Sequence, residues 1–340
     1  MRLSKTLYVT GHRTKIALQK DSLIISDPGK GKRRIPLEAL DSVVLLGNAQ
    51  VTTQTMAACT RRGVRIASLS RGGKLRFYVG GPVSGNVYLR LAQLNASQDS
   101  EQSLEIARAV VVGKLRNSRS LTQRWLWDAR PESRWTLRDC IEALSDRVHA
   151  AEDASSLDRL RGIEGDAARR YFKAMRAALW SSGMRFNART RRPPRDPVNC
   201  LLSFTYAMLV TETVGSIEAA GLDPQVGFLH GIRPGRPSLA LDLVEELRSS
   251  IADRLVVAAL RRRQFQEDDF ESTPGGACYL SGRGRSKLLK LWEARRDEEI
   301  QHRLLARNIP RASLPSIQAT ILARHLRGDL PTYVPYLVDM

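Results

Sequence analysis

The sequence predicts an α+β protein, with a β-rich N-terminal domain over residues 1–88 and a mostly α-helical C-terminal domain over residues 89–340. Two patterns support this prediction. Short β-branched runs separated by turn residues fill the first part, whereas long stretches with apolar residues at three- and four-residue spacing fill the second. A chain of 340 residues, 42% of them apolar, is also longer than one hydrophobic core usually covers, so we expect two domains.

The N-terminal domain is expected to contain several short strands and a single helix. The strands are predicted at residues 7–9, 15–18, 22–25, 43–46, 64–67 and 75–78. Residues 54–62 are predicted to be helical. Residues 27–32, with the sequence Asp-Pro-Gly-Lys-Gly-Lys, are typical of a turn between two strands.

The C-terminal domain is predicted to be a series of helices separated by segments that contain Pro or Gly. The interruptions fall at Pro131 and at residues 192–197, 233–237 and 272–276. One helix is expected to begin with Ser238 as its N-cap. The apolar face of that helix would consist of Leu243, Leu247, Ile251 and Leu255.

The charge of the chain indicates a polyanionic partner. Lys and Arg number 54 against 35 Asp and Glu, a formal net charge of +19. Residues 1–90 hold 16 cations and 4 anions, and most of the cations in the whole chain are Arg. Guanidinium groups bind phosphate oxygens through paired hydrogen bonds, which favours nucleic acid. A high-GC genome would also raise Arg over Lys, and a charged face can simply be solvated.

Other features exclude some classes of protein. The longest uncharged stretch, residues 42–60, contains too many polar side chains for a membrane span, and the first five residues lack the apolar region of a signal peptide. The four cysteines, Cys59, Cys140, Cys200 and Cys278, are too far apart in the sequence for a zinc knuckle. We therefore expect a cytoplasmic protein with reduced thiols and no membrane partner.

The first candidate for chemistry is Glu164. Residues 161–195 contain ten cations and two anions, so this carboxylate lies within a basic segment. Helical spacing places it on the same face as Ala168, Tyr171, Met175 and Leu179. A carboxylate on a face that becomes buried needs a partner. The alternative is an acid in the first turn of a helix, where the helix dipole stabilises it.

The second candidate is a loop His followed by helical acids. His230 lies between Gly- and Pro-rich residues, and a neutral imidazole there could be a ligand or a general base. Asp242 and Glu245 are three residues apart on the expected polar face of the following helix, with Glu246 on the same side, so they could hold one cation. Alternatively, these acids are merely solvated.

Together, these residues indicate a metal site. Carboxylate oxygens with one imidazole nitrogen suit a hard divalent ion, Mn²⁺ or Mg²⁺, better than Zn²⁺. A divalent ion among arginines is what phosphodiester chemistry requires, because the metal polarises the phosphoryl oxygen and the arginines hold the backbone.

The order of the motifs resembles the CRISPR-associated adaptation endonuclease/integrase family, the large subunit of spacer acquisition, over nearly the whole chain. The matching residues are Gly81-Pro82-Val83-Ser84-Gly85-Asn86 with Arg90 and Gln93, Glu164-Gly165-x-x-Ala168-Arg169-x-Tyr171-Phe172, Arg192-Pro193-Pro194-x-Asp196-Pro197-Val198-Asn199, Leu201-Leu202-Ser203-Phe204-x-Tyr206, His230 and Asp242-Leu243-x-Glu245-Glu246-Leu247-Arg248. Residues 323–328 and Tyr333-x-Pro335-Tyr336 resemble the tail of the subtype found in compact type I systems, the type I-C-like subtype. The family often has Pro where this chain has Ser249, which leaves only the continuation of the helix in question.

The resemblance implies a β-rich domain that forms a homodimer and contacts DNA, and a helical catalytic domain. It implies that Glu164, His230 and Glu245 bind Mn²⁺ or Mg²⁺, with Asp242 as an additional catalytic acid. The expected reaction is attack of a DNA 3′-hydroxyl on a repeat phosphodiester, which inserts a short foreign fragment into a CRISPR array. The implied partners are double-stranded DNA and a small ferredoxin-like adaptation protein. The arginines assigned to phosphate binding are Arg189, Arg191, Arg192, Arg233, Arg236 and Arg248.

Two other functions fit the same residues. The chain could be a nucleic-acid-binding protein whose acids are structural, or a divalent-metal nuclease of repair that cuts DNA without joining it.

Overall fold

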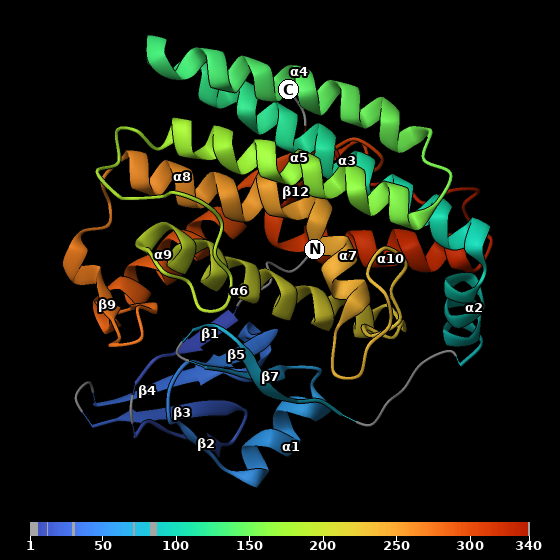
Figure 1. The fold of residues 1–340 in the computed structure, drawn as a ribbon. Coiled ribbons are helices and arrows are strands. Elements are labelled where there is room, and N and C mark those ends of the chain that lie inside the picture. Colours follow the sequence, from blue (N-terminus) through green and yellow to red (C-terminus); the bar gives the residue numbers. More distant parts are fainter. Residues whose placement is uncertain (1–5, 12, 29–30, 71, 82–86, 339–340) are drawn as a thin grey trace.

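The computed structural model describes residues 6–11, 13–28, 31–70, 72–81 and 87–338. It confirms the predicted fold class, because a strand-rich N-terminal part precedes a helical part (Figure 1). Residues 82–86 of the Gly81–Asn86 motif and residues 29–30 of the predicted turn lie outside the described residues. The expected boundary after residue 88 falls in the first turn of helix α2 (Val87–Gln98).

The N-terminal part contains two four-stranded sheets and helix α1 (Thr53–Arg61). One sheet has the order β1 (Thr6–Val9), β5 (Ser42–Leu45), β7 (Arg65–Leu69) and β8 (Leu75–Val79); the other has the order β4 (Gly31–Pro36), β3 (Ser22–Asp27), β2 (Lys15–Gln19) and β6 (Gln50–Val51). Strands β1, β5 and β7 are parallel, and β8 pairs antiparallel with β7. All predicted strands are present, together with β4 and β6, which the sequence did not indicate. Strand β4 is mostly exposed and its sequence is highly basic, so it lacks a strand pattern.

Strand β5 separates the two hydrophobic cores of the molecule. Val43 and Leu45 pack in the core between the N-terminal sheets and α1, whereas Val44 and Leu46 pack in the core of the helical part. Side chains alternate between the two faces of a strand, so consecutive apolar residues supply both cores. This explains the unbroken apolar run at residues 43–46, which is typical of a strand that is buried on both faces.

The helical part stacks in layers above the sheets, with α4 farthest from them (Figure 1). Its helices after α2 are α3 (Ser100–Trp127), α4 (Pro131–Glu152), α5 (Leu157–Ala178), α6 (Pro197–Ala219), α7 (Ser238–Arg248), α8 (Arg254–Arg261), α9 (Gly282–Asp297) and α10 (Leu314–Leu326). Two short hairpins interrupt them: β9 (Phe270–Ser272) with β10 (Cys278–Leu280), and β11 (Glu299–His302) with β12 (Arg307–Pro310). Pro131 is the first residue of α4, and Asp196 caps α6 by accepting a hydrogen bond from the Asn199 amide, as Pro and Asp prefer.

Helix α7 does not begin as predicted. Ser238 is its first residue rather than its N-cap, and the Ser238 hydroxyl donates a hydrogen bond to the Gly231 carbonyl instead. The helix continues through a π-helical turn, Ser249–Asp253, into α8, so Ser249 does not end it. The expected apolar residues Leu243, Leu247, Ile251 and Leu255 are buried.

Helix α6 holds the N-terminal sheet to the helical part. Glu212 accepts a hydrogen bond from the Trp292 indole at 3.1 Å and forms an ion pair with Arg296 at 3.2 Å, and the Tyr8 hydroxyl points to the same carboxylate. One turn and a half further on, Glu218 pairs with Arg65 of β7 at 3.1 Å.

Among the described residues, α6 is also the one helix that is long and apolar enough to cross a membrane by length and composition. The sequence patterns did not predict this helix as a membrane span. Of its most apolar window, 56% is buried inside the protein, as in the core helix of many globular proteins. The apolar character of α6 is therefore weak evidence for a membrane segment.

Candidate functional site

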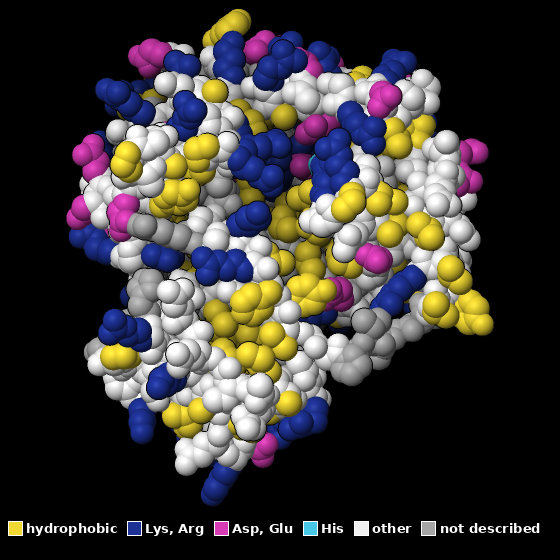
Figure 2. All heavy atoms as spheres, turned by 60° about the horizontal axis from the view of Figure 1, so that its bottom comes forward, with side chains coloured by type: hydrophobic (Ala, Val, Ile, Leu, Met, Phe, Trp, Pro, Cys, Tyr) yellow, Lys and Arg dark blue, Asp and Glu magenta, His cyan; other side chains and the backbone are white. Residues whose placement is uncertain are grey.

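The predicted site residues come from three separate segments that meet in the helical part. Glu164 lies in the second turn of α5, Asp242 and Glu245 lie in α7, and His230 lies in the loop between α6 and α7. A pocket of about 420 Å³ opens where α5 and this loop meet. The pocket is lined by Arg161, Glu164, Leu229, His230, Gly231, Arg233 and Arg236. On the face shown in Figure 2, Lys and Arg side chains rim a hollow in the helical part, with acidic side chains inside it.

Asp242 holds the loop that carries His230. Its carboxylate is 1% exposed and accepts hydrogen bonds from the backbone amides of Phe228 (2.6 Å), Leu229 (3.1 Å) and His230 (2.9 Å). It also contacts Nδ1 of His230 at 2.7 Å. Asp242 is therefore neither a solvated acid nor an acid that faces the pocket. It fixes the backbone and the ring of His230, which leaves Nε2 as the nitrogen on the opposite side of the ring.

Gly227 makes this arrangement possible. A Cβ at residue 227 would lie 2.8 Å from Oδ2 of Asp242 and 2.7 Å from the Ser238 backbone carbon. The chain therefore passes too close to the start of α7 for any side chain.

Glu164 and Glu245, which we call the acid pair, share one cation. Lys114, from the middle of α3, bonds Oε1 of Glu164 and lies 2.5 Å from Oε2 of Glu245. The Lys114 side chain is 6% exposed, against 26% for Glu164 and 14% for Glu245. Glu164 thus lines the pocket, whereas Glu245 lies behind it, on the other side of Lys114. The partner that a buried Glu164 requires is Lys114.

Lys114 was not among the predicted site residues, although the sequence contains a signal for it. Lys114 lies on the same helix face as the buried apolar residues Val110, Val111 and Leu121, which precede it by four and three residues and follow it by seven. It is also the one Lys between Lys74 and Lys173, in a chain that otherwise uses Arg. A lone Lys on an apolar helix face indicates a buried acidic partner, but nothing local indicates which acid.

Neighbouring cations keep Glu245 ionised. Burial acts to raise its pKa, but the Lys114 ammonium and the Arg248 guanidinium outweigh burial and hold the pKa of Glu245 well below its usual range. Arg248 is 6% exposed, contacts Glu245 at 3.1 Å and donates to the Tyr206 hydroxyl at 3.1 Å. Burial acts to lower the pKa of Arg248, yet Tyr206, Glu245 and Asp253 raise it above its usual range.

A buried polar network lies behind the acid pair. Asp253, in the π-helical turn, accepts hydrogen bonds from the hydroxyls of Tyr171 (2.9 Å) and Tyr206. Burial raises the pKa of the Asp253 carboxyl. Tyr206 in turn contacts Arg248, so the network continues to Glu245. Tyr171 and Tyr206 of the sequence motifs therefore support the acid pair from inside rather than facing the pocket.

Glu246 faces away from the pocket. It is fully buried and accepts hydrogen bonds from the Gln318 amide (3.1 Å), the Tyr336 backbone amide (2.8 Å) and the Tyr333 hydroxyl. Burial raises its pKa to about 7. The alternative that Glu246 is merely a solvated acid is wrong, because the C-terminal segment covers that side of α7.

The six arginines assigned to phosphate binding divide into two groups. Arg233 and Arg236 line the pocket, and Arg191 and Arg192 are exposed in the loop before α6. Within the described part of the chain, none of these four has an ion-pair partner. Two others have internal partners: Arg248, as described, and Arg189, which bonds Asn199 at 2.8 Å and Ser203 at 3.1 Å. We therefore assign Arg189 and Arg248 a structural role.

The residues of the pocket suit a divalent cation by their chemistry. Two carboxylates already hold one cation, the Lys114 ammonium, and a nearby imidazole is oriented through Nδ1 by a buried carboxylate, as metal-binding His residues commonly are. In the ranges that the structure describes, however, no three His, Cys, Asp or Glu side chains form a ready cluster around a metal position. The carboxylate and imidazole groups are therefore of the type that binds Mn²⁺ or Mg²⁺, and the Lys114 ammonium lies between the two carboxylates.

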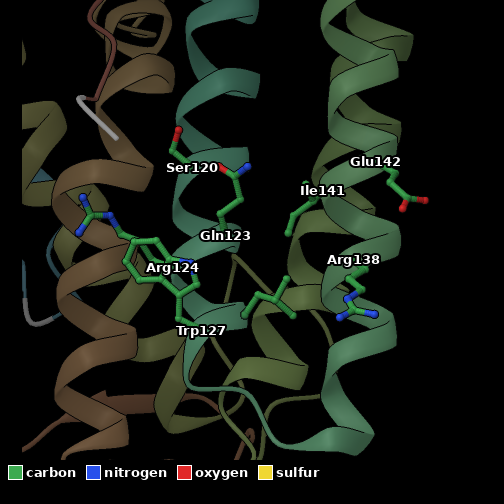
Figure 3. Close-up of a pocket in the computed structure, with 8 residues that line it drawn as sticks. Ser120, Gln123, Arg124, Trp127, Arg138, Ile141 and Glu142 are labelled. Atoms are coloured by element: carbon green, nitrogen blue, oxygen red, sulfur yellow. The ribbon is translucent and has the colours of Figure 1, made fainter.

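A second cavity, also of about 420 Å³, lies between α3 and α4 and contains none of the predicted site residues (Figure 3). Its walls include Gln123, Trp127 and Ile141, and the Arg138 and Glu142 side chains of α4 extend away from α3. No acid pair or His lines it. The chemistry of the first pocket therefore makes that pocket the candidate site.

Comparisons with known proteins agree with the motifs. The sequence profile of the family described as CRISPR associated protein Cas1 matches residues 7–294. The chain is 39% identical over 338 residues to CRISPR-associated endonuclease Cas1 1 of Moorella thermoacetica, covering 98% of both chains. It is 40% identical over 345 residues to CRISPR-associated endonuclease Cas1 2 of Rhodospirillum rubrum, again covering 98% of both.

Solved structures share the fold. A CAS1 protein from Thermotoga maritima superposes with a TM-score of 0.82 at 23% identity, over 95% of this chain and 97% of that one. A casposase bound to its integration product gives a TM-score of 0.84 at 22% identity, over 97% and 92%. A chain of a Cas6-RT-Cas1–Cas2 complex gives 0.83 at 21% identity, over all of this chain and 37% of that one. With a matching profile over most of its length and relatives at 39–40% identity, the chain belongs to the CRISPR-associated Cas1 family.

Proposed function

We propose that this protein is a divalent-metal-dependent DNA endonuclease and integrase that inserts short foreign DNA fragments into a CRISPR array. The observation that supports it most is the pocket. Glu164 and His230 line its wall, and Glu245 lies behind Glu164, joined to it through Lys114. Arg233 and Arg236 line the same pocket without an ion-pair partner among the described residues. Relatives at 39–40% identity are named endonucleases, and the casposase with the same fold is bound to an integration product.

The residues of this chain have separable tasks in the proposed reaction. Arg233 and Arg236 bind backbone phosphates at the mouth of the pocket, since their charges are otherwise unpaired in the described structure. Glu164, His230 and Glu245 would hold Mn²⁺ or Mg²⁺. When bound, such an ion polarises the phosphoryl oxygen and stabilises charge on the attacking or leaving oxygen. Asp242 keeps His230 in the orientation and tautomer in which Nε2 can donate its lone pair.

The proposed reaction conserves phosphodiester bonds. The 3′-oxygen of the fragment forms a bond to a phosphorus of the repeat. The bond from that phosphorus to the oxygen of the neighbouring nucleotide breaks, and this oxygen becomes the end of the released strand. The attacking hydroxyl loses its proton, and the released oxygen gains one. No external energy source is required, because one phosphodiester replaces another. If water attacks instead, the same site cuts DNA.

The proposed partners follow from the family and its neighbours. We propose a homodimer formed through the N-terminal sheets, acting in the cytoplasm on double-stranded DNA with a small ferredoxin-like partner; the Cas2 named in the complex above supports a partner protein. We also propose the type I-C-like subtype. In the structure, the tail residues Tyr333 and Tyr336 of that resemblance attach the C-terminal segment to α7.

A strand-joining assay tests the proposal. Purified protein with its partner and Mn²⁺ is incubated with a fragment ending in a 3′-hydroxyl and with a repeat-containing target. We expect a branched product, and we expect Glu164→Ala, His230→Ala and Glu245→Ala to abolish it while the proteins still bind DNA.

Two results would favour the alternatives. Full joining by the three variants would indicate a binding protein whose acids are structural. Cutting without any branched product, with every component present, would indicate a nuclease that does not integrate.

A further inference from the structure

Lys114 occupies the position where the acid pair converges. Its Nζ bonds one oxygen of Glu164 and lies 2.5 Å from Oε2 of Glu245, and its side chain is 6% exposed. An ammonium this deeply buried loses its hydration, and the two carboxylates compensate for that loss. In turn, the ammonium removes the repulsion between two carboxylates that approach the same point.

The local charges are already balanced without a metal ion. The acid pair contributes two negative charges, and Lys114 and Arg248 contribute two positive ones. A divalent ion bound to the same carboxylate oxygens would leave two positive charges in excess. One of the two side-chain cations must therefore move or the ion must bind weakly.

Lys114 is the cation that can move. Arg248 is held on several sides, because it contacts Glu245, donates to the Tyr206 hydroxyl and lies over the rings of Tyr206 and Phe172. Lys114 has a flexible four-carbon stem, and its two ion pairs with described residues are both to the acid pair. Beyond Glu164, however, the pocket is lined by Arg161, Arg233 and Arg236, which would repel a displaced ammonium. A DNA phosphate among those arginines would make the same position favourable.

We propose that Lys114 is a built-in counter-cation that competes with the divalent ion for the acid pair and makes binding of the ion depend on DNA. This inference rests on the proposed metal site. In the free protein, Lys114 holds Glu164 and Glu245 and opposes binding of the metal. When DNA phosphates enter the pocket, the ammonium turns toward them and releases the carboxylates. Lys114 is thus a positioning residue that couples two binding events.

The test measures Mn²⁺ binding by calorimetry, with and without a short duplex whose 3′ ends are dideoxy so that they cannot be joined. Lys114→Met keeps the apolar stem and removes the charge. We expect this variant to bind Mn²⁺ alone roughly tenfold more tightly than the unaltered chain, and to gain less affinity from DNA. Arg116→Met is the matched control, because Arg116 lies two positions further along α3 and pairs with Glu152 at the surface. It should bind Mn²⁺ as the unaltered chain does.

Thermal unfolding provides a second measurement. Without metal, Lys114→Met leaves two carboxylates without their shared partner, so its midpoint should fall, and Mn²⁺ should raise it more than it raises that of the unaltered chain. Lys114→Gln, which keeps one donor, serves the same purpose if the Met variant does not fold.

The possible results separate this inference from the proposed function. Equal Mn²⁺ affinity of the unaltered chain and the Lys114 variants, with an equal gain from DNA, overturns the counter-cation role while leaving the metal site intact. Failure of every protein to bind Mn²⁺, with or without DNA, overturns the metal site itself.

Discussion

Glu245 and Glu246 are adjacent in α7 and have opposite surroundings. Glu245 meets Lys114 and Arg248 beside an open pocket, and these cations lower its pKa. The described partners of Glu246 are all neutral donors from the C-terminal part of the chain, and burial raises its pKa to about 7. The same side chain on one helix therefore serves two purposes. Its neighbours, not its residue type, decide which carboxylate can do chemistry.

The largest expected difference between them is in DNA processing. Glu245→Gln should reduce strand joining by more than about 100-fold, because it removes a ligand charge, and even indirect support of a metal site is worth about 10–100-fold. Glu246→Gln, the same change one residue away, should leave joining within a few fold. Quantifying branched product per unit of folded protein checks both. Equal losses of strand joining in the two variants would show that the different surroundings of Glu245 and Glu246 do not decide which of them takes part in the reaction.

Stability against pH is the next largest effect. Glu246 binds its proton more tightly in the folded protein, where its pKa is about 7, than in the unfolded chain, where it is near 4.5. Its contribution is therefore complete below pH 4.5 and is lost as pH rises to 7, at most about 3 kcal/mol. The lowered pKa of Glu245 has the opposite sign, so its contribution is lost only in acid. Urea unfolding at pH 5 and pH 7.5 should show a smaller decline for Glu246→Gln than for the unaltered chain; identical declines would contradict the assignment.

Asp242→Asn tests whether Asp242 holds the loop and the ring of His230 in place. The amide keeps the size of the side chain but weakens the bonds to the loop amides and to Nδ1 of His230. We expect a loss of about 10–100-fold in Mn²⁺ affinity, measured by calorimetry, with DNA affinity unchanged. A parallel loss of DNA affinity would mean that Asp242 acts on the whole pocket instead of His230.

The arginines should give the smallest effects. Arg233→Ala should weaken DNA binding and reduce the slope of log K against log salt by about 1, because one phosphate contact releases about 0.9 counterions. Arg189→Ala should lower stability and leave the slope unchanged, because its guanidinium bonds Asn199 and Ser203. Fluorescence anisotropy at several salt concentrations distinguishes the two. A reduced slope for Arg189→Ala would return it to the DNA-contacting group.

The fold was largely predictable from the sequence because periodicity and turn residues are local properties. Short β-branched runs bounded by turn residues locate the strands, and the three- and four-residue spacing of apolar residues in α5 and α7 places the apolar faces of these helices correctly. Strands β4 and β6 were not predicted. The middle of β4 is Lys32-Arg33-Arg34, and the strand conformation of these exposed cations depends on pairing with β3. Tertiary pairing of this kind leaves no periodic trace.

The site was predictable only in part. Helical spacing and loop composition identify Glu164, His230, Asp242 and Glu245 as candidates, but they place Asp242, Glu245 and Glu246 together on one polar face of the helix. Asp242 and Glu246 are buried because the 228–230 loop and the C-terminal segment cover α7, and each cover comes from a distant part of the chain. Lys114 was not predicted for the same reason, because its partners Glu164 and Glu245 lie 50 and 131 residues away in the sequence.

Strand β5 has a consequence for how this protein can be divided or recombined. Separating the N-terminal sheets from the helical part would remove Val44 and Leu46 from the core of the helical part. The apolar surfaces of both parts would then be exposed to water. Neither half could be exchanged with that of a relative unless the partner surface were exchanged with it. The N-terminal sheets and the helices that hold the pocket are thus expected to evolve as one unit, because β5 contributes side chains to the cores of both.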